Sequence, residues 1–178
     1  AFIDRLGAAG HRIIEVGAFV NPRRVPQMGD TADVCARITR LDGVRYTALV
    51  PNQQGLDRAQ AAALHDIAIF AASSDGFSRA NINASVEDAF AGYAEVCRDA
   101  VARGMRVRGY LSTAFGCPYD GPVAPERVAE LTARLLEMGV CEVAVSDTIG
   151  IAHPGQVSAV LDVLAARVPL DRVALHFH

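Results

Sequence analysis

Short apolar runs alternate with segments of helical periodicity along the whole chain. Six runs rich in Val, Ile, Ala and Phe have the length and composition of β-strands. They cover residues 12–19, 45–50, 67–72, 107–115, 142–147 and 173–178. Helical periodicity covers residues 31–41, 55–64, 86–103, 125–138 and 154–168, and the first ten residues resemble the end of a helix closed by glycine. The pattern therefore predicts strands and helices in alternation.

This alternation predicts an α/β fold with a parallel sheet, because strands that are apolar almost throughout are buried on both faces. Two architectures satisfy the pattern, an open doubly wound sheet and a TIM (β/α)8 barrel. The barrel is favoured because polar side chains recur at the carboxyl ends of the strands, which a barrel gathers into one ring. These residues are Glu15, Asn52, Ser73, Ser112, Asp147, His176 and His178. No G-x-G-x-x-G turn for a dinucleotide follows the first strand.

The barrel is expected to be incomplete. A barrel of this type has eight strands in about 250 residues, whereas the 178 residues of this chain offer six strands. The sequence opens on a helix end and stops at a strand tip. We therefore expect an internal segment with about strands 2 to 7, so that residues 1–178 form one partial catalytic barrel domain.

Composition excludes several function classes. The chain is 51% hydrophobic and 21% charged, as in a globular protein, and no apolar run approaches the roughly 20 residues of a membrane span. Its net charge of −3 argues against nucleic acid as a partner. All 17 basic residues are arginine, so this segment holds neither a Schiff-base lysine nor a Walker-type phosphate loop. The four cysteines are far apart, which indicates reduced thiols in a reducing compartment.

Two histidines close the last predicted strand. His176 and His178 are two positions apart, so both side chains point to the same face, which in a barrel is the interior. Two neutral imidazoles held in this way can take adjacent positions on one divalent metal. The alternative is a pair of hydrogen-bonded core histidines.

Two carboxylates accompany them at the carboxyl ends of strands. Asp147 can act as a base, bind a metal or orient an imidazole, but an Asp after a strand also commonly accepts hydrogen bonds from the following turn. Glu15 lies inside an apolar strand, where an unpaired carboxylate is costly. We expect it to have a partner in the ring, with a structural ion pair to arginine as the alternative.

Other candidate residues have simpler interpretations. Cys117 lies in a turn bounded by glycine and proline, and no histidine is close in sequence to lower its pKa, so a small apolar thiol is favoured over a nucleophile. His11, His65 and His153 have no partner at a ligand spacing and are predicted to be surface or loop residues. Arg23 and Arg24 could meet an anionic substrate at the mouth or form a solvated charge pair. Both arginines lie in the predicted loop 21–28.

Five motifs together resemble a known family. "NPRRVPQMGD", "FSRANINASVEDA", "VRGYLSTAFGCPYDGPV", "SDTIGIAHPG" and "LHFH" occur in this order along essentially the whole chain. They resemble hydroxymethylglutaryl-CoA lyase, a metal-dependent member of the barrel superfamily that includes isopropylmalate and homocitrate synthases. The H-x-H and D-T-x-G pieces are shared across that superfamily, whereas "VPQM", "NIN" and "GCPYDG" look specific to the lyase.

The resemblance implies cleavage of hydroxymethylglutaryl-CoA to acetyl-CoA and acetoacetate with Mg2+ or Mn2+. It implies that His176 and His178 are metal ligands, and that His176 also serves in proton transfer. It makes Asp147 and Glu15 catalytic, and places Asn81 and Thr148 in the substrate pocket. An acyl-CoA substrate and a homo-oligomer, a dimer when full length, are expected with it. The compartment is the cytoplasm in bacteria and the mitochondrial matrix in animals, and the arginine- and alanine-rich composition favours a bacterium.

Several parts of the family pattern do not occur in this sequence. The Arg-Asp pair of the first strand, the later glycine-rich loop with the catalytic cysteine and the asparagine ligand after it do not match any part of the chain. Cys117 precedes Asp147, so it does not correspond to that later cysteine. We therefore expect this polypeptide alone to be inactive.

Two other function classes remain open on the sequence. The nearest is a synthase of the same superfamily that condenses acetyl-CoA with a 2-oxo acid, with a pyruvate aldolase as a more distant relative. A glycine-rich cysteine loop after "HFH" would favour the lyase, and a long regulatory domain would favour the synthase. The other class is a non-catalytic incomplete barrel, which should associate or aggregate through its unpaired strand edges.

Overall fold

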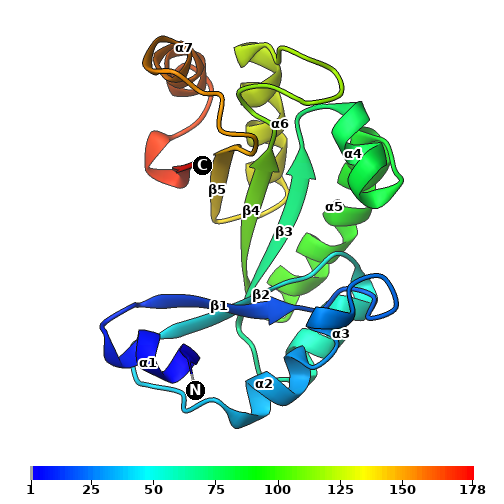
Figure 1. The fold of residues 1–178 in the computed structure, drawn as a ribbon, viewed down its shortest axis with the longest axis vertical. Coiled ribbons are helices and arrows are strands. Elements are labelled where there is room, and N and C mark those ends of the chain that lie inside the picture. Colours follow the sequence, from blue (N-terminus) through cyan, green and yellow to red (C-terminus); the bar gives the residue numbers. More distant parts are fainter. Residues whose placement is uncertain (1) are drawn as a thin grey trace.

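Six parallel strands form one curled sheet in the computed structural model, which describes residues 2–178 (Figure 1). The strands lie in the order of the sequence, from β1 to β6. They are β1 (Ile13–Ala18), β2 (Arg45–Leu49), β3 (Asp66–Ala72), β4 (Arg106–Ser112), β5 (Glu142–Asp147) and β6 (Val173–Phe177). Because every pair is parallel and sequential, all six carboxyl ends lie along one rim, as the barrel prediction requires.

Helices connect the strands and cover the outer face of the sheet (Figure 1). They are α1 (Phe2–Ala8), α2 (Thr31–Arg37), α3 (Gln53–Ala61), α4 (Asp75–Ile82), α5 (Val86–Ala102), α6 (Pro125–Glu137) and α7 (Pro154–Ala165), with short 3-10 helices at Pro26–Met28 and Leu170–Arg172. Their ends follow the signals in the sequence. Ser85 Oγ accepts a hydrogen bond from Asp88 N at the start of α5, and Gly104 and Gly139 have positive φ just beyond α5 and α6.

The hydrophobic core lies between the outer face of the sheet and the helices. On β4, Val107 and Leu111 are buried in this core, and a Cβ on Gly109 would contact Val140 and Leu135. The alternate positions, Arg108 and Tyr110, face the inside of the curl and are partly exposed. The strands thus follow the period of two expected for residues on opposite faces of a sheet.

The curl is only part of a barrel wall. Among residues 2–178 no strand pairs with the outer edge of β1 or of β6, so the sheet does not close. The inner face is therefore open, and Ile13 on β1 is 51% exposed there. This arrangement confirms the predicted fold class, an α/β barrel that is incomplete in this chain.

Two differences from the predicted elements have local causes. The strand expected at 107–115 ends at Ser112, because Thr113 has a φ of 57° and turns the backbone out of the extended conformation. Helix α4 was not predicted. The segment of α4 is short and mixed in polarity. Its first turn is stabilised by a residue distant in the sequence, Asp120, whose Oδ2 accepts a hydrogen bond from Gly76 N at 2.7 Å.

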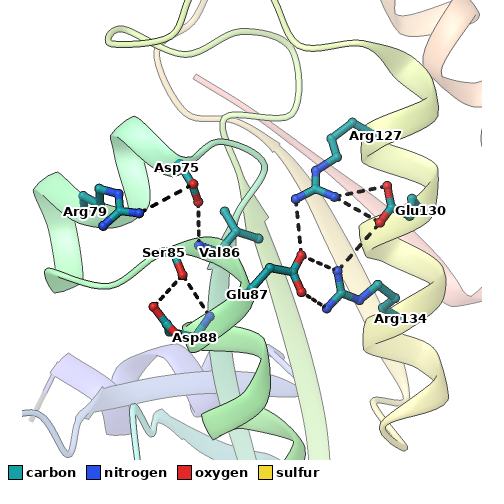
Figure 2. A network of polar contacts seen from close by, with 9 residues as sticks. All are labelled: Asp75, Arg79, Ser85, Val86, Glu87, Asp88, Arg127, Glu130 and Arg134. Atoms are coloured by element: carbon teal, nitrogen blue, oxygen red, sulfur yellow. Dashed lines mark hydrogen bonds and ion pairs between the residues drawn. The ribbon is translucent and has the colours of Figure 1, made fainter.

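An ion-pair network joins helices α5 and α6 (Figure 2). Both carboxylate oxygens of Glu87 accept hydrogen bonds from the two terminal nitrogens of Arg134, at 2.8 and 2.7 Å. Arg127 and Glu130 extend the network along α6. The hydrogen bonds from Arg134 hold the pKa of Glu87 below its ordinary value. Because the Glu87 side chain is 64% exposed, solvent screens most of this interaction.

We expect the Glu87–Arg134 pair to stabilise the fold by less than about 1 kcal/mol at neutral pH. The pKa of Glu87 is depressed in the folded state, so this stability is present above the unfolded pKa and is lost as pH falls through the folded pKa. A double-mutant cycle of Glu87→Gln and Arg134→Gln in chemical denaturation should show the coupling at pH 7 and its loss in acid. Glu95→Gln, an exposed site on the same helix, is the control. A coupling that is independent of pH would contradict this account.

Candidate functional site

The paired histidines lie side by side at the carboxyl end of β6. The imidazole rings of His176 and His178 stack with their centroids 4.8 Å apart and their planes 18° apart. Between them Phe177 points to the opposite face, where its ring contacts the buried Phe115 at 5.7 Å. Since Phe115 belongs to the core under the helices, the two imidazoles lie on the inner face of the curl. In the strand register His176 is beside Ser146 of β5.

Glu15 has a partner inside the ring, although not an arginine. Its Oε2 accepts a hydrogen bond of 2.8 Å from the hydroxyl group of Tyr110 on β4. The bond reaches from the first strand of the sheet to the fourth across the inner face, because the sheet is curled. Glu15 is exposed rather than buried, since the inner face of this partial barrel is open.

Tyr110 is a functional candidate that the sequence did not reveal. A single tyrosine in a strand is an ordinary β-former, and only its contact with Glu15 distinguishes it. Burial, and then the charge of the Glu15 carboxylate, raise the pKa of Tyr110, against the opposing effect of Arg108. The guanidinium of Arg108 lies over the Tyr110 ring, 5.0 Å from its centroid, and its Nε donates to Glu142 at 2.7 Å. Tyr110 is therefore held as a protonated donor that points at a carboxylate.

Asp147 is buried, with 3% of its surface exposed, and both of its oxygens hold the loop that follows β5. Its Oδ1 accepts from Ile151 N and its Oδ2 from Ala152 N, each at 3.0 Å. This is the turn-acceptor alternative considered for the sequence. The loop passes close to the histidine pair. A Cβ added to Gly150 of this loop would lie only 3.4 Å from the carbonyl oxygen of His178. Asp147 thus orders the backbone next to the imidazoles.

Thr148 and Asn81 lie in different surroundings. The Thr148 hydroxyl accepts a 2.7 Å hydrogen bond from the backbone N–H of Thr113, the residue with the left-handed backbone after β4. A non-glycine residue in this conformation is often found at functional sites. Asn81 is exposed on α4, and within residues 2–178 no hydrogen bond joins it to the histidine pair. Thr148 is therefore hydrogen-bonded to the loop after β4, whereas Asn81 is placed only by its position on helix α4.

The remaining candidates take structural positions. Cys117 is buried, and its Sγ accepts hydrogen bonds from the backbone N–H groups of Tyr119 and Asp120, both at 3.3 Å, within the turn predicted for it. His153 is the N-cap of α7, with Nδ1 accepting from Gln156 N at 3.3 Å. Both residues serve turns, and in the described part of the chain neither forms a hydrogen bond or ring contact with His176 or His178.

The inner face offers two imidazole nitrogens to a metal ion. Across the described residues, 2–178, no group of three or more His, Cys, Asp and Glu side chains is placed to hold one. The stacked pair His176 and His178 fits two neighbouring positions on one ion, and the other positions would need oxygen atoms of water, of a substrate or of residues outside this chain.

The fold and the site define the class of protein: part of a (β/α) barrel with paired imidazoles on the inner face of its carboxyl rim. Comparison with known families narrows this class, because the model of the family described as HMGL-like matches residues 1–178. The chain belongs to the HMGL-like family, whose members depend on a metal.

Named relatives support the same assignment. The chain is 46% identical over 176 residues to hydroxymethylglutaryl-CoA lyase of Pseudomonas mevalonii and 40% identical to the human mitochondrial enzyme of that name. A crystal structure of hydroxymethylglutaryl-CoA lyase from Pseudomonas aeruginosa matches it with a TM-score of 0.96 at 44% identity. Each match covers 99% of this chain but only 58%, 54% and 59% of the relative. The chain thus spans between half and three fifths of each of these three relatives.

The contact between Glu15 and Tyr110 can be tested by titration. We expect Glu15→Gln to lower the pKa of Tyr110 from its raised value, because a negative charge next to the phenol opposes its ionisation. The measurement is a pH titration of ring carbons in the labelled protein, followed by NMR. Glu126→Gln, which removes an exposed carboxylate from α6, should leave the Tyr110 titration unchanged. An unchanged Tyr110 pKa in Glu15→Gln would show that the two groups are not in contact in solution.

Proposed function

We propose that this chain is part of a hydroxymethylglutaryl-CoA lyase, which cleaves its substrate to acetyl-CoA and acetoacetate. The observation that carries the proposal is the stacked pair His176 and His178 on the inner face of the rim, in a chain 40–46% identical to curated relatives, most of them named as this lyase. Because the chain spans only part of these relatives, the activity is assigned to the whole protein. Residues 1–178 are proposed to be part of its catalytic barrel domain.

The cofactor is proposed to be Mg2+ or Mn2+, with His176 and His178 as two of its ligands. When bound, such an ion would supply an electrophile for the oxygens of the substrate and would stabilise the negative charge that develops during cleavage. The preference of these ions for oxygen suits a site in which the substrate itself provides ligands. The proposal of these two ions, rather than another divalent metal, rests on the family resemblance.

The reaction is a retro-aldol cleavage, and it needs a base and an acid. The tertiary hydroxyl group loses its proton as the carbon–carbon bond breaks, leaving the ketone of acetoacetate and a thioester enolate. A proton added to the enolate carbon then gives acetyl-CoA. His176 is proposed to serve in the second of these proton transfers, because its imidazole is exposed on the inner face, where a substrate can reach it, and a ring bound to a metal through one nitrogen keeps an N–H on the other that can donate a proton.

The other proposed residues support that centre. Glu15 and its donor Tyr110 form a polar pair on the same inner face, and are proposed to contact the reacting part of the substrate. Asp147 is proposed to act by fixing the loop beside His178, since both of its oxygens accept backbone N–H bonds. Asn81 and Thr148 are proposed to line the substrate pocket, on the strength of the family motif.

An acyl-CoA substrate is proposed from the names of the relatives, and a dimer of the full-length protein from the family resemblance. The cytoplasm of a bacterium is proposed from the arginine- and alanine-rich composition, with the mitochondrial matrix as the compartment of a eukaryotic protein. Within residues 2–178, no helix has both the length and the apolar character to cross a membrane.

The histidine pair should bind Mn2+ in the isolated chain. Paramagnetic Mn2+ should broaden the imidazole proton signals of His176 and His178, and His176→Gln should abolish the effect at His178. His65→Gln, an exposed histidine elsewhere on the chain, is the matched control and should change nothing. Broadening that is equal at all five histidines would argue against a site at the pair.

In the whole protein the same substitution tests the activity. His176→Gln and His178→Gln should each lower kcat for cleavage of hydroxymethylglutaryl-CoA, measured as acetoacetate released with Mg2+, on the order of 100-fold or more, because loss of a ligand weakens both metal binding and charge stabilisation. The His65→Gln variant should retain its rate. A whole protein that binds Mn2+ at the pair but releases no acetoacetate would contradict the lyase and favour a condensation reaction.

A further inference from the structure

A pocket opens on the same rim of the sheet as the histidine pair, but apart from it. It has a volume of about 450 Å3 and lies between the loop after β1 and the start of α3, at the carboxyl ends of β1 and β2. It is lined by Phe19, Val20, Asn21, Pro22, Arg23, Asn52, Gln54 and Arg58. None of these lining residues is acidic, although the chain as a whole has 20 acidic and 17 basic residues.

The polar groups of this pocket are arranged as donors. The Asn21 Oδ1 already accepts from Arg23 N at 2.9 Å, and the Asn52 Oδ1 accepts from Gly55 N at 2.9 Å. No hydrogen bond within residues 2–178 uses either amide nitrogen, so each is left for another partner. The first turn of α3 contains no acidic residue, so the positive end of the helix dipole is not neutralised there.

Arg58 is held in place at the wall of the pocket. Its guanidinium lies over the Phe19 ring, 5.2 Å from the centroid, and its Nη1 donates to Val20 O at 3.3 Å. These contacts use one of its five N–H groups and fix the plane of the rest. The neighbouring acid, Asp57, is paired with Arg103 at 2.7 Å instead. In the part of the chain that the structure describes, neither Arg58 nor Arg23 forms an ion pair with a carboxylate.

We propose that this pocket binds a phosphate-type anion. A phosphate has oxygens in several directions, which suits guanidinium and amide donors that approach from two loops and a helix end. The same chemistry could come from a phosphate group of the acyl-CoA substrate or from free inorganic phosphate. Binding of the anion stands on the pocket alone, whereas its assignment to the substrate would rest on the proposed lyase function.

Inorganic phosphate and diphosphate are the probes, titrated into the 178-residue chain and followed by calorimetry and by the arginine side-chain signals in NMR. Arg23→Gln and Arg58→Gln should each weaken binding roughly tenfold, the effect expected for one lost charge-assisted hydrogen bond. Arg24→Gln is the matched control, because Arg24 is the next residue of the same loop but does not line the pocket. It should change the affinity less than twofold.

Arg58 also contacts Phe19 and Val20, so its loss could disturb the loop. Arg58→Lys keeps the charge but loses the planar fork, and should give an intermediate affinity. Arg23 is exposed, and among residues 2–178 its side chain forms no hydrogen bond or ion pair, so Arg23→Gln separates binding from folding. Phosphate binding that is absent in the unmodified chain, or that Arg24→Gln weakens as much as Arg23→Gln does, would overturn the proposal.

The source of the anion is identified by competition in the whole protein. If coenzyme A displaces phosphate from Arg23 and Arg58, and Arg23→Gln raises KM for the acyl-CoA with little change in kcat, the anion belongs to the substrate. If phosphate binds and coenzyme A does not compete, the pocket serves the free ion. Phosphate binding that persists in a protein without lyase activity would refute the proposed function while leaving the pocket intact.

Discussion

Parallel pairing of strands in the order of the sequence is the constraint on which the rest of this structure depends. Each strand hides one face under the helices, and the hydrophobic contacts of that face fix its register relative to its neighbours. Because every strand runs in the same direction, every carboxyl end reaches the same rim. The rim then collects residues that are more than 100 positions apart, such as Glu15 and His176, without any direct attraction between them.

The two faces of the sheet carry different kinds of residue for this reason. The face under the helices is apolar, as Val107 and Leu111 show, while the inner face accepts charge. Arg108 and Glu142 are partners in the register of β4 and β5 and form an ion pair across it. In a closed barrel such groups would be enclosed and would need one another, since an unpaired buried charge is costly. The period of two along each strand is what allows one segment to serve both the core and the site.

The sequence was sufficient for those features that depend on periodicity. The alternation along β6 predicted that His176 and His178 share a face, and their rings lie stacked 4.8 Å apart. Apolar runs located all six strands, with errors of three residues or fewer at their ends. The end of β4 was misplaced because the left-handed conformation of Thr113 depends on a contact from another loop, the hydroxyl of Thr148. Contacts of that kind leave no signal in the local pattern.

The partners of the carboxylates were not predictable either, and the reason is geometric. Glu15 was expected to pair within the ring, but its donor is on β4, three strands away, and only the degree of curl brings the Tyr110 hydroxyl within 2.8 Å of it. Asp147 lies on the same face of β5 as Val143 and Val145, which is the face under the helices. Its carboxylate is therefore on the side of the loop rather than beside the imidazoles. A carboxylate in that position stabilises the backbone through two N–H donors. The rim is therefore shaped by residues from both faces of the strands, because one set points to the inner face of the curl and the other holds the loops around it.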